Sequence, residues 1–192
     1  MSEDATLPLV VGISGASGVR LGVRVLDACR ELGVATHLVV SRAGAQTLAS
    51  EAGLEVAQVA AGADVSHRAG DIGASIASGS FPTRGMIIAP CSVRTMSEIA
   101  TGVTSSLMTR AADVTLKERR PLLLCVRETP FNRVHLRNMT LAAEAGAVIF
   151  PCIPAFYNRP QDSAEMARQF VYRVLAHIGL PQPGAYVWKP EE

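Results

Sequence analysis

The sequence predicts an α/β protein in which helices cover both faces of a parallel β-sheet. Strand-like and helix-like segments alternate from one end of the chain to the other, which is the pattern of parallel strands joined by crossover helices. The clearest strand, residues 122–126, is an apolar run long enough to be buried on both faces. It ends abruptly at Arg127 and Glu128, and in open α/β sheets ligands lie beyond the carboxyl ends of such strands.

Short apolar runs mark the expected strands, which cover residues 8–13, 36–40, 85–89, 122–126 and 147–150. The segments between them predict helices over residues 19–32, 42–51, 92–100, 106–117, 134–145 and 163–178. Residues 54–77 have mixed character and leave two alternatives open, a short strand with a helix or a loop over the site. We expect residues 1–192 to form one domain. Residues 181–192, with three prolines, cannot continue the preceding helix and are expected to form a tail that wraps over the surface.

The composition excludes several classes of function. A chain of 192 residues with 48% hydrophobic content can form a packed core, and its net charge of +1 offers no overall field for nucleic acid or a membrane surface. No apolar run approaches the roughly 18 residues of a membrane span, and the acidic start is unlike a secretory signal. The four cysteines lack metal-ligand spacing, so we expect no metal, reduced thiols and a cytoplasmic location. Charged residues make up 18%, below the usual ~25%, which favours contacts between subunits.

A loop of small residues, 12–18, follows the first expected strand and leads into a helix. Its glycines and serines let the backbone approach an anion, and the helix N-terminus adds unsatisfied amides and a favourable dipole. Ser14 breaks the dinucleotide G-x-G-x-x-G spacing, and the second strand ends in Ser41 rather than an acidic ribose ligand. No Lys follows Gly18, so a Walker A loop does not fit either. The loop predicts a phosphate or flavin cradle, or simply a tight strand-to-helix turn.

A second small-residue helix start, residues 89–95, follows the third clear strand. We expect Ser92 to cap this helix, with Thr95 one turn later on the same face. Upstream, residues 77–80 are small enough to let a flat ring or another chain approach closely. Two such helix starts on one sheet indicate a ligand with a phosphate and a planar part.

Charged residues gather before and after the strand at 122–126. Basic residues are favoured near the C-terminus of a helix, so Glu118, Arg119 and Arg120 are interpreted as a solvated helix end. The Arg127–Glu128 pair beyond the strand is placed to handle an anionic ligand and a proton, although a surface ion pair would give the same pattern.

Seven motifs carry a family resemblance. They are Gly15-Ala16-Ser17-Gly18, Ser78-Gly79-Ser80, Pro90-Cys91-Ser92, Arg110-Ala111-Ala112-Asp113, Leu116-Lys117-Glu118-Arg119-Arg120-Pro121, Arg127-Glu128-Thr129-Pro130 and Phe156-Tyr157. In their order and spacing they resemble the UbiX-type flavin prenyltransferases, from about residue 7 to residue 188. The resemblance implies a Rossmann-like (flavodoxin-like) three-layer sandwich, the fold of the homo-oligomeric flavin-containing Cys decarboxylase superfamily.

The activity that the resemblance implies is metal-independent transfer of the dimethylallyl group of dimethylallyl monophosphate to N5 and C6 of reduced FMN, with release of phosphate. The product, prenylated FMN, serves UbiD-type decarboxylases, which are therefore the expected partners. Family members assemble as dodecamers with the flavin at subunit junctions, so a homododecamer is expected here.

The family's residue roles are carried over position by position. Glu128 is the expected acid/base, with Glu51, Ser17 and Lys117 as further catalytic residues. FMN contacts are expected at Gly15, Ala16, Ser17, Ser41, Ser92, Val93, Arg94, Thr95 and Arg127. Contacts with the prenyl donor, dimethylallyl monophosphate, are expected at Tyr157, Arg173, Lys117, Arg127, Trp188 and Arg110. The cations and a tyrosine hydroxyl would offset phosphate charge, and the two aromatic rings would stabilise the allyl cation.

Three other interpretations fit the sequence less well. A flavin-dependent cysteine decarboxylase of the same fold would have a substrate clamp with Met and Asn, but residues 128–132 contain no Met, and His67 lies too far upstream to be its catalytic His. A non-catalytic flavin carrier, or an assembly subunit of a decarboxylase complex, would be favoured by the loss of Lys117 or Glu128, and both are present. Direct decarboxylation of an aromatic acid would need machinery beyond a flavin site, and the sequence shows none.

Overall fold

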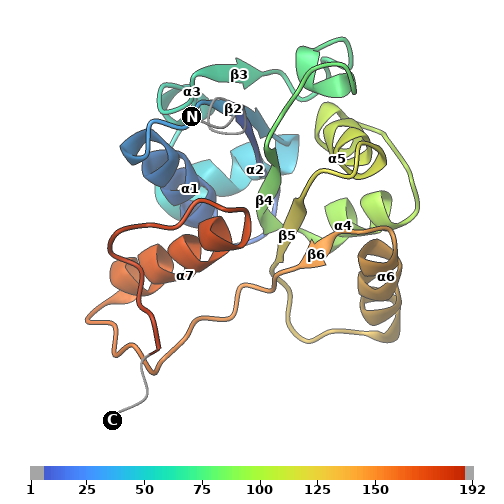
Figure 1. Cartoon of the computed structure of the whole chain (residues 1–192). Helices are drawn as coiled ribbons and strands as arrows, with labels where there is room; N and C mark the ends of the chain where they lie inside the picture. The colour runs from blue at the N-terminus through green and yellow to red at the C-terminus, as the bar shows by residue number, and fades with distance from the viewer. Residues whose placement is uncertain (1–6, 189–192) are drawn as a thin grey trace.

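A parallel sheet forms the centre of the molecule. The computed structural model describes residues 7–188, so the acidic start of the chain and the last four residues of the expected tail lie outside the described residues. Within that range, six parallel strands pair in the order β3-β2-β1-β4-β5-β6 (Figure 1). The strands are β1 (Leu9–Ile13), β2 (Thr36–Val40), β3 (Val65–His67), β4 (Gly85–Cys91), β5 (Leu122–Val126) and β6 (Val148–Ile149). This is the strand order of doubly wound Rossmann sheets, and it confirms the predicted fold class.

Helices cover the sheet on both sides. On one face lie α1 (Arg20–Glu31) and α7 (Ser163–His177); on the other lie α4 (Val93–Ala100), α5 (Leu107–Lys117) and α6 (Arg133–Glu144) (Figure 1). Neighbouring residues of one strand therefore enter different cores, as Val10 and Val11 of β1 do. This explains why the central strands are apolar at nearly every position. No helix within residues 7–188 is long and apolar enough to cross a membrane.

Most expected elements are confirmed, and the differences concern short ones. The strand expected to end at residue 89 continues as β4 to Cys91. The helix expected over residues 42–51 is divided into α2 (Arg42–Thr47) and a π-helical turn, η2 (Leu48–Ala52). Between residues 54 and 77 the strand-and-helix alternative is correct: the chain forms α3 (Val56–Ala60), β3 and a 3₁₀ turn, η3 (Ser75–Ala77).

Two histidines join β3 to the sheet. His37 Nδ1 of β2 lies 2.9 Å from His67 Nε2 of β3, and the buried His37 ring packs against Phe81 at a centroid distance of 5.1 Å. Burial, followed by the neighbouring His67, lowers the pKa of His37, although Asp64 acts in the opposite direction. Burial also lowers the pKa of His67, opposed by Asp71. Both imidazoles are therefore held in the neutral form near neutral pH.

Helix α1 packs very closely on the sheet at Gly22. A Cβ atom at this position would lie 2.6 Å from Cγ1 of Ile13 and would also meet the backbone carbonyl of Ala89. Only a glycine lets α1 approach β1 and β4 this closely, and this approach sets the place of the 15–18 loop that precedes the helix.

Replacing Gly22 by alanine should destabilise the fold. The new methyl group has to displace backbone, so Gly22→Ala should lower the free energy of unfolding by about 1–3 kcal/mol. Urea unfolding measures this change. Gly70→Ala is the matched control because its Cβ would meet nothing within 4 Å, and equal stability of the two variants would contradict the close packing.

The histidine pair should make stability fall in mild acid. A folded pKa below the ordinary 6.5 means that the unfolded chain binds more protons. The resulting stabilisation is complete above about pH 6.5 and is lost as the pH falls through the folded pKa. Thermal unfolding between pH 7.5 and 5 should therefore show a falling midpoint, with a smaller fall in His67→Gln. The same pH slope in that variant would exclude the pair as its cause.

Candidate active site

The topological switch point lies between β1 and β4, because the helices that follow these two strands pack on opposite faces of the sheet. Ligands of doubly wound sheets bind at this point. A buried serine joins the two strand ends there. Ser14 Oγ donates to the carbonyl of Pro90 at 2.9 Å and accepts from the backbone N–H of Ser92 at 2.7 Å. Ser14 thus fixes the start of α4 relative to the loop after β1. This role of Ser14 was not predicted; a polar residue at the end of an apolar strand, before a loop of small residues, is the signal in the sequence that could have indicated it.

The loop after β1 is held by Glu51. Its carboxylate accepts from Ser17 Oγ at 3.0 Å and from the backbone N–H of Gly18 at 2.9 and 3.0 Å. Glu51 lies in the π-helical turn η2, a kind of distortion that is frequent at functional sites. The structure therefore brings together Ser17 and Glu51, two of the predicted catalytic residues, next to Gly15 and Ala16.

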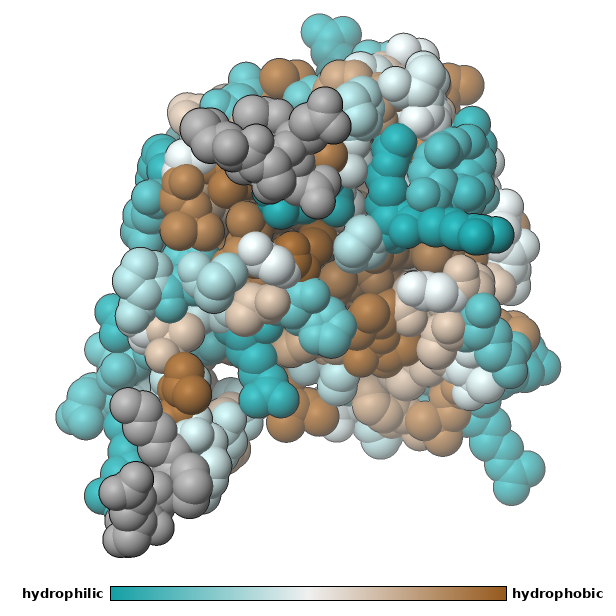
Figure 2. Space-filling model, viewed as in Figure 1, coloured by the Kyte–Doolittle hydropathy of each residue, from teal (hydrophilic) through white to brown (hydrophobic). Residues whose placement is uncertain are grey.

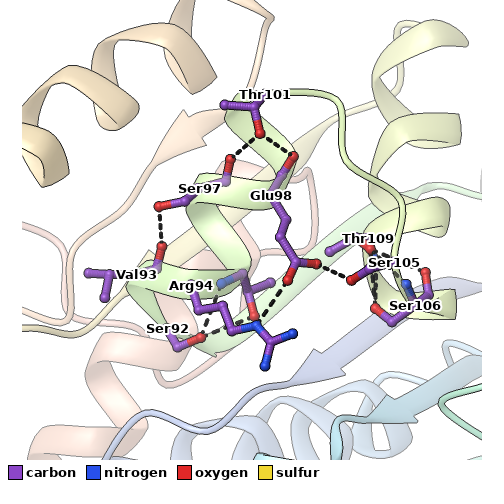
Figure 3. A network of polar contacts seen from close by, with 10 residues as sticks. Ser92, Val93, Arg94, Ser97, Glu98, Thr101, Ser105, Ser106 and Thr109 are labelled. Carbon is purple, nitrogen blue, oxygen red and sulfur yellow. Dashed lines mark hydrogen bonds and ion pairs between the residues drawn. The ribbon is translucent and has the colours of Figure 1, made fainter.

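Two predicted FMN-contact serines are helix caps. Ser41 accepts from the N–H of Gly44, and Ser92 accepts from the N–H of Thr95 at 3.2 Å, which confirms the expected cap (Figure 3). The N–H groups of Val93 and Arg94 in the first turn of α4 have no hydrogen-bond partner among the described residues. Hydroxyls and free first-turn amides beside an arginine are a donor set that fits a phosphate group.

Arg127 and Glu128 follow β5 at the same edge. The N–H of Arg127 donates to the carbonyl of Cys91, and Glu128 is half-buried with its carboxylate accepting from the N–H of Thr129. Arg127 shares the wall of a cavity of about 270 Å³ with Ser17 and Cys152. Burial raises the pKa of Cys152 to about 12, although Arg127 lowers it, so this free cysteine is a neutral thiol and a poor nucleophile.

The predicted donor contacts near the C-terminus also lie together. Arg173 donates to the hydroxyl of Tyr157 at 3.3 Å, and the Tyr157 ring packs edge-to-face with Trp188 at 5.6 Å. The tail folds back on α7 because Gln169 accepts from the N–H of Tyr186 and donates to the carbonyl of Gly184. Tyr157 and Arg173 line a cavity of about 760 Å³, visible in Figure 2 as a hollow between the tail and the rest of the molecule. This cavity shares three wall residues with the smaller one: Pro154, Met166 and Phe170.

Arg110 and Lys117 lie elsewhere. They belong to α5, which ends before the amino end of β5, whereas Arg127 and Glu128 follow its carboxyl end. Arg110 donates to the carbonyl of Ala77 at 3.2 Å and pairs with Asp113 at 2.7 Å. Lys117 pairs with Glu118 and lowers the pKa of that carboxyl. Within one chain these two predicted donor contacts are therefore not brought to the strand-end site.

The interpretation of Arg120 as a solvated residue is wrong. Its guanidinium donates to the carbonyls of Phe81 and Gly79, each at 2.8 Å. Arg120 thus holds the 78–81 segment against the end of α5. A Cβ atom at Gly79 would meet only the ends of the Lys117 and Glu118 side chains, which are flexible and could move aside.

The parallel sheet and its switch point define a doubly wound α/β protein. The hydrogen-bond donors beyond the strand ends give it a binding site for an anionic ligand. The Flavoprotein family model matches residues 1–169. Flavin prenyltransferase UbiX of Salmonella typhimurium is 57% identical over 176 residues, covering 91% of this chain and 93% of the relative. UbiX of Escherichia coli K12 is 56% identical with the same coverage. The chain belongs to the flavoprotein family and, within it, to the UbiX-type flavin prenyltransferases.

Solved structures agree with this assignment. AnUbiX (PadA1), crystallised with FMN and dimethylallyl pyrophosphate, superposes with a TM-score of 0.95 at 42% identity, covering 97% of this chain and all of that one. A dodecameric FMN-dependent UbiX-like decarboxylase from Escherichia coli O157:H7 gives 0.92 at 44% identity, covering 95% and 100%. The cysteine decarboxylase TvaF, at 16% identity and a TM-score of 0.62 over 74% of this chain and 88% of its own, shares the fold alone.

Removing the Ser14 hydroxyl should loosen the switch point. Ser14→Ala leaves the partly buried N–H of Ser92 without its acceptor and removes a fully buried hydroxyl, which should cost about 1–3 kcal/mol of unfolding free energy. Chemical denaturation measures the loss against Ser50→Ala, whose exposed hydroxyl bonds only within its own helical turn. Wild-type stability of Ser14→Ala would show that the joint contributes nothing.

Proposed function

We propose that this chain transfers the dimethylallyl group of dimethylallyl monophosphate to N5 and C6 of reduced FMN and releases phosphate. The observation that carries the proposal is the loop after β1, which contacts Glu51 and the start of α4 and shares a cavity with Arg127. Membership of the UbiX-type family supports the same reaction. So does PadA1, which binds both FMN and a dimethylallyl donor.

The strand-end loops would hold FMN. Gly15, Ala16, Ser17 and Ser41 would contact the flavin from the ends of β1 and β2, and residues 92–95 with Arg127 from β4 and β5. The partnerless amides of Val93 and Arg94 suit its phosphate. When bound in reduced form, FMN supplies the two nucleophilic positions of the reaction.

The cationic side chains would stabilise the departing phosphate. Breaking the allylic C–O bond leaves negative charge on the phosphate oxygens, which Arg127, Arg173 and the Tyr157 hydroxyl can offset by charge-assisted hydrogen bonds. The bond between Arg173 and Tyr157 keeps both donors at one place in the larger cavity. The rings of Tyr157 and Trp188 offer π faces to the allyl cation on the same side.

Glu128 would transfer the protons. Half-buried at the end of β5 next to Arg127, it can protonate the leaving phosphate and later accept a proton from the ring carbon that forms the second bond. Glu51 would act with Ser17, whose hydroxyl it orients at 3.0 Å.

We further propose that the complete site forms between subunits of a homododecamer. Arg110 and Lys117 lie on α5 and line neither cavity of the site, so a neighbouring subunit would supply them to the phosphate of the prenyl donor. The dodecameric relative and the low charge content support this assembly. The chain would act as one domain in the cytoplasm, where its free cysteines stay reduced, and would pass prenylated FMN to a UbiD-type decarboxylase.

The reaction is tested by anaerobic incubation with reduced FMN and dimethylallyl monophosphate, followed by mass analysis of the flavin. A gain of one C5 unit with release of phosphate is expected. Running the diphosphate in parallel determines which donor the enzyme uses. Unmodified FMN with both donors would overturn the proposed activity.

Glu128→Gln should bind FMN normally and lose at least ~100-fold of the turnover rate, because the amide cannot exchange the proton. Glu144→Gln, an exposed change at the end of α6, is the matched control. Turnover by Glu128→Gln at the control's rate would remove Glu128 from the mechanism.

A further inference from the structure

An ion pair on α4 joins a predicted FMN contact to a residue with no assigned role. Arg94 Nε donates to Oε1 of Glu98, one helical turn later, at 3.0 Å (Figure 3). The Arg94 side chain is 84% exposed, whereas that of Glu98 is 18% exposed. Glu98 is thus the fixed member of the pair and Arg94 the member that it restrains.

Glu98 is fixed from a second direction. Its other carboxylate oxygen accepts from Ser105 Oγ at 2.6 Å, in the loop between α4 and α5 (Figure 3). The carbonyl of Glu98 accepts from the N–H of Val103 at 2.8 Å, in the same loop. The Ser105 bond holds the carboxylate while it binds the arginine, and the Val103 bond ties the same loop to the backbone of Glu98.

The order of the two charges is unfavourable with respect to the dipole of α4. A cation in the first turn with an anion four residues later is the less favourable order, because the N-terminus of a helix carries partial positive charge. Exposed pairs of this kind add little stability in any case. Helix stability therefore does not account for Arg94 and Glu98.

The ion pair with Glu98 leaves part of the Arg94 guanidinium available to bind an anion. The bond uses Nε, and the two terminal nitrogens have no hydrogen-bond partner among residues 7–188. Arg94 and the partnerless amides of Val93 and Arg94 belong to the same first turn of α4. A restrained guanidinium loses less side-chain freedom on binding than a freely rotating one.

We propose that Glu98 is a positioning residue that holds Arg94 toward the phosphate of FMN. This inference rests on the proposed function, since it requires FMN at the start of α4. The effect is confined to ligands that carry the phosphate group. Glu98 contacts the arginine and not the flavin.

The test is titration of the purified protein with FMN and, separately, with riboflavin, which lacks the phosphate, following the quenching of flavin fluorescence. Glu98→Ala should raise the Kd for FMN about three- to tenfold, with no change for riboflavin. Glu98→Gln keeps an acceptor oxygen at the same reach and should restore most of the affinity. In an Arg94→Ala background, Glu98→Ala should change nothing further. Asp27→Ala, which removes a partner of Arg24 and Arg30 on α1, is the matched control.

The outcomes separate the two proposals. Wild-type protein that binds no FMN would overturn the proposed function and this inference with it. FMN binding that is equal in wild type and Glu98→Ala would overturn the inference alone. Parallel weakening of FMN and riboflavin would show that Glu98 only maintains the structure of α4, and would equally overturn it.

Discussion

The joint between β1 and β4 is the contact on which the other parts of the site depend. The crossover helices diverge at this point, so neither of them covers the two strand ends, and the opening between them is the place for a ligand. The ends of β1 and β4 therefore need another contact to keep them aligned. The Ser14 hydroxyl provides it by donating to Pro90 of β4 and accepting from Ser92, which caps α4. The position of the loop after β1 and that of the start of α4 both depend on this one buried hydroxyl.

The length of the sheet separates like charges within one chain. Lys117 precedes β5 and the Arg127–Glu128 pair follows it, and the five residues of the strand span about 16 Å. Lys117 and Arg110 meanwhile pair with Glu118 and Asp113. An assembly in which edges of different subunits meet would concentrate positive charge only where an anion arrives to balance it.

Burial explains which parts of the structure could be predicted from the sequence. Central strands such as β5 are apolar on both faces and are recognisable, and Ser92 as a helix cap follows from its position before an apolar helix. The edge strand β3 has only three residues, mostly exposed, and depends on the non-local pairing of His37 with His67. The role of Arg120 could not be predicted because its partners, the carbonyls of Gly79 and Phe81, are far from it along the chain. The role of Glu98 depends on the loop conformation that brings Ser105 to its carboxylate.

The aromatic corner formed by Tyr157 and the tail has a spectroscopic consequence. Trp188 is the chain's only tryptophan, so ultraviolet emission excited at long wavelength originates almost entirely from this corner of the fold. Flavins absorb light where tryptophan emits, and energy transfer between them depends steeply on distance. Trp188 is therefore an intrinsic energy-transfer donor close to the larger cavity. Movements of the tail could be followed in real time without attaching a label.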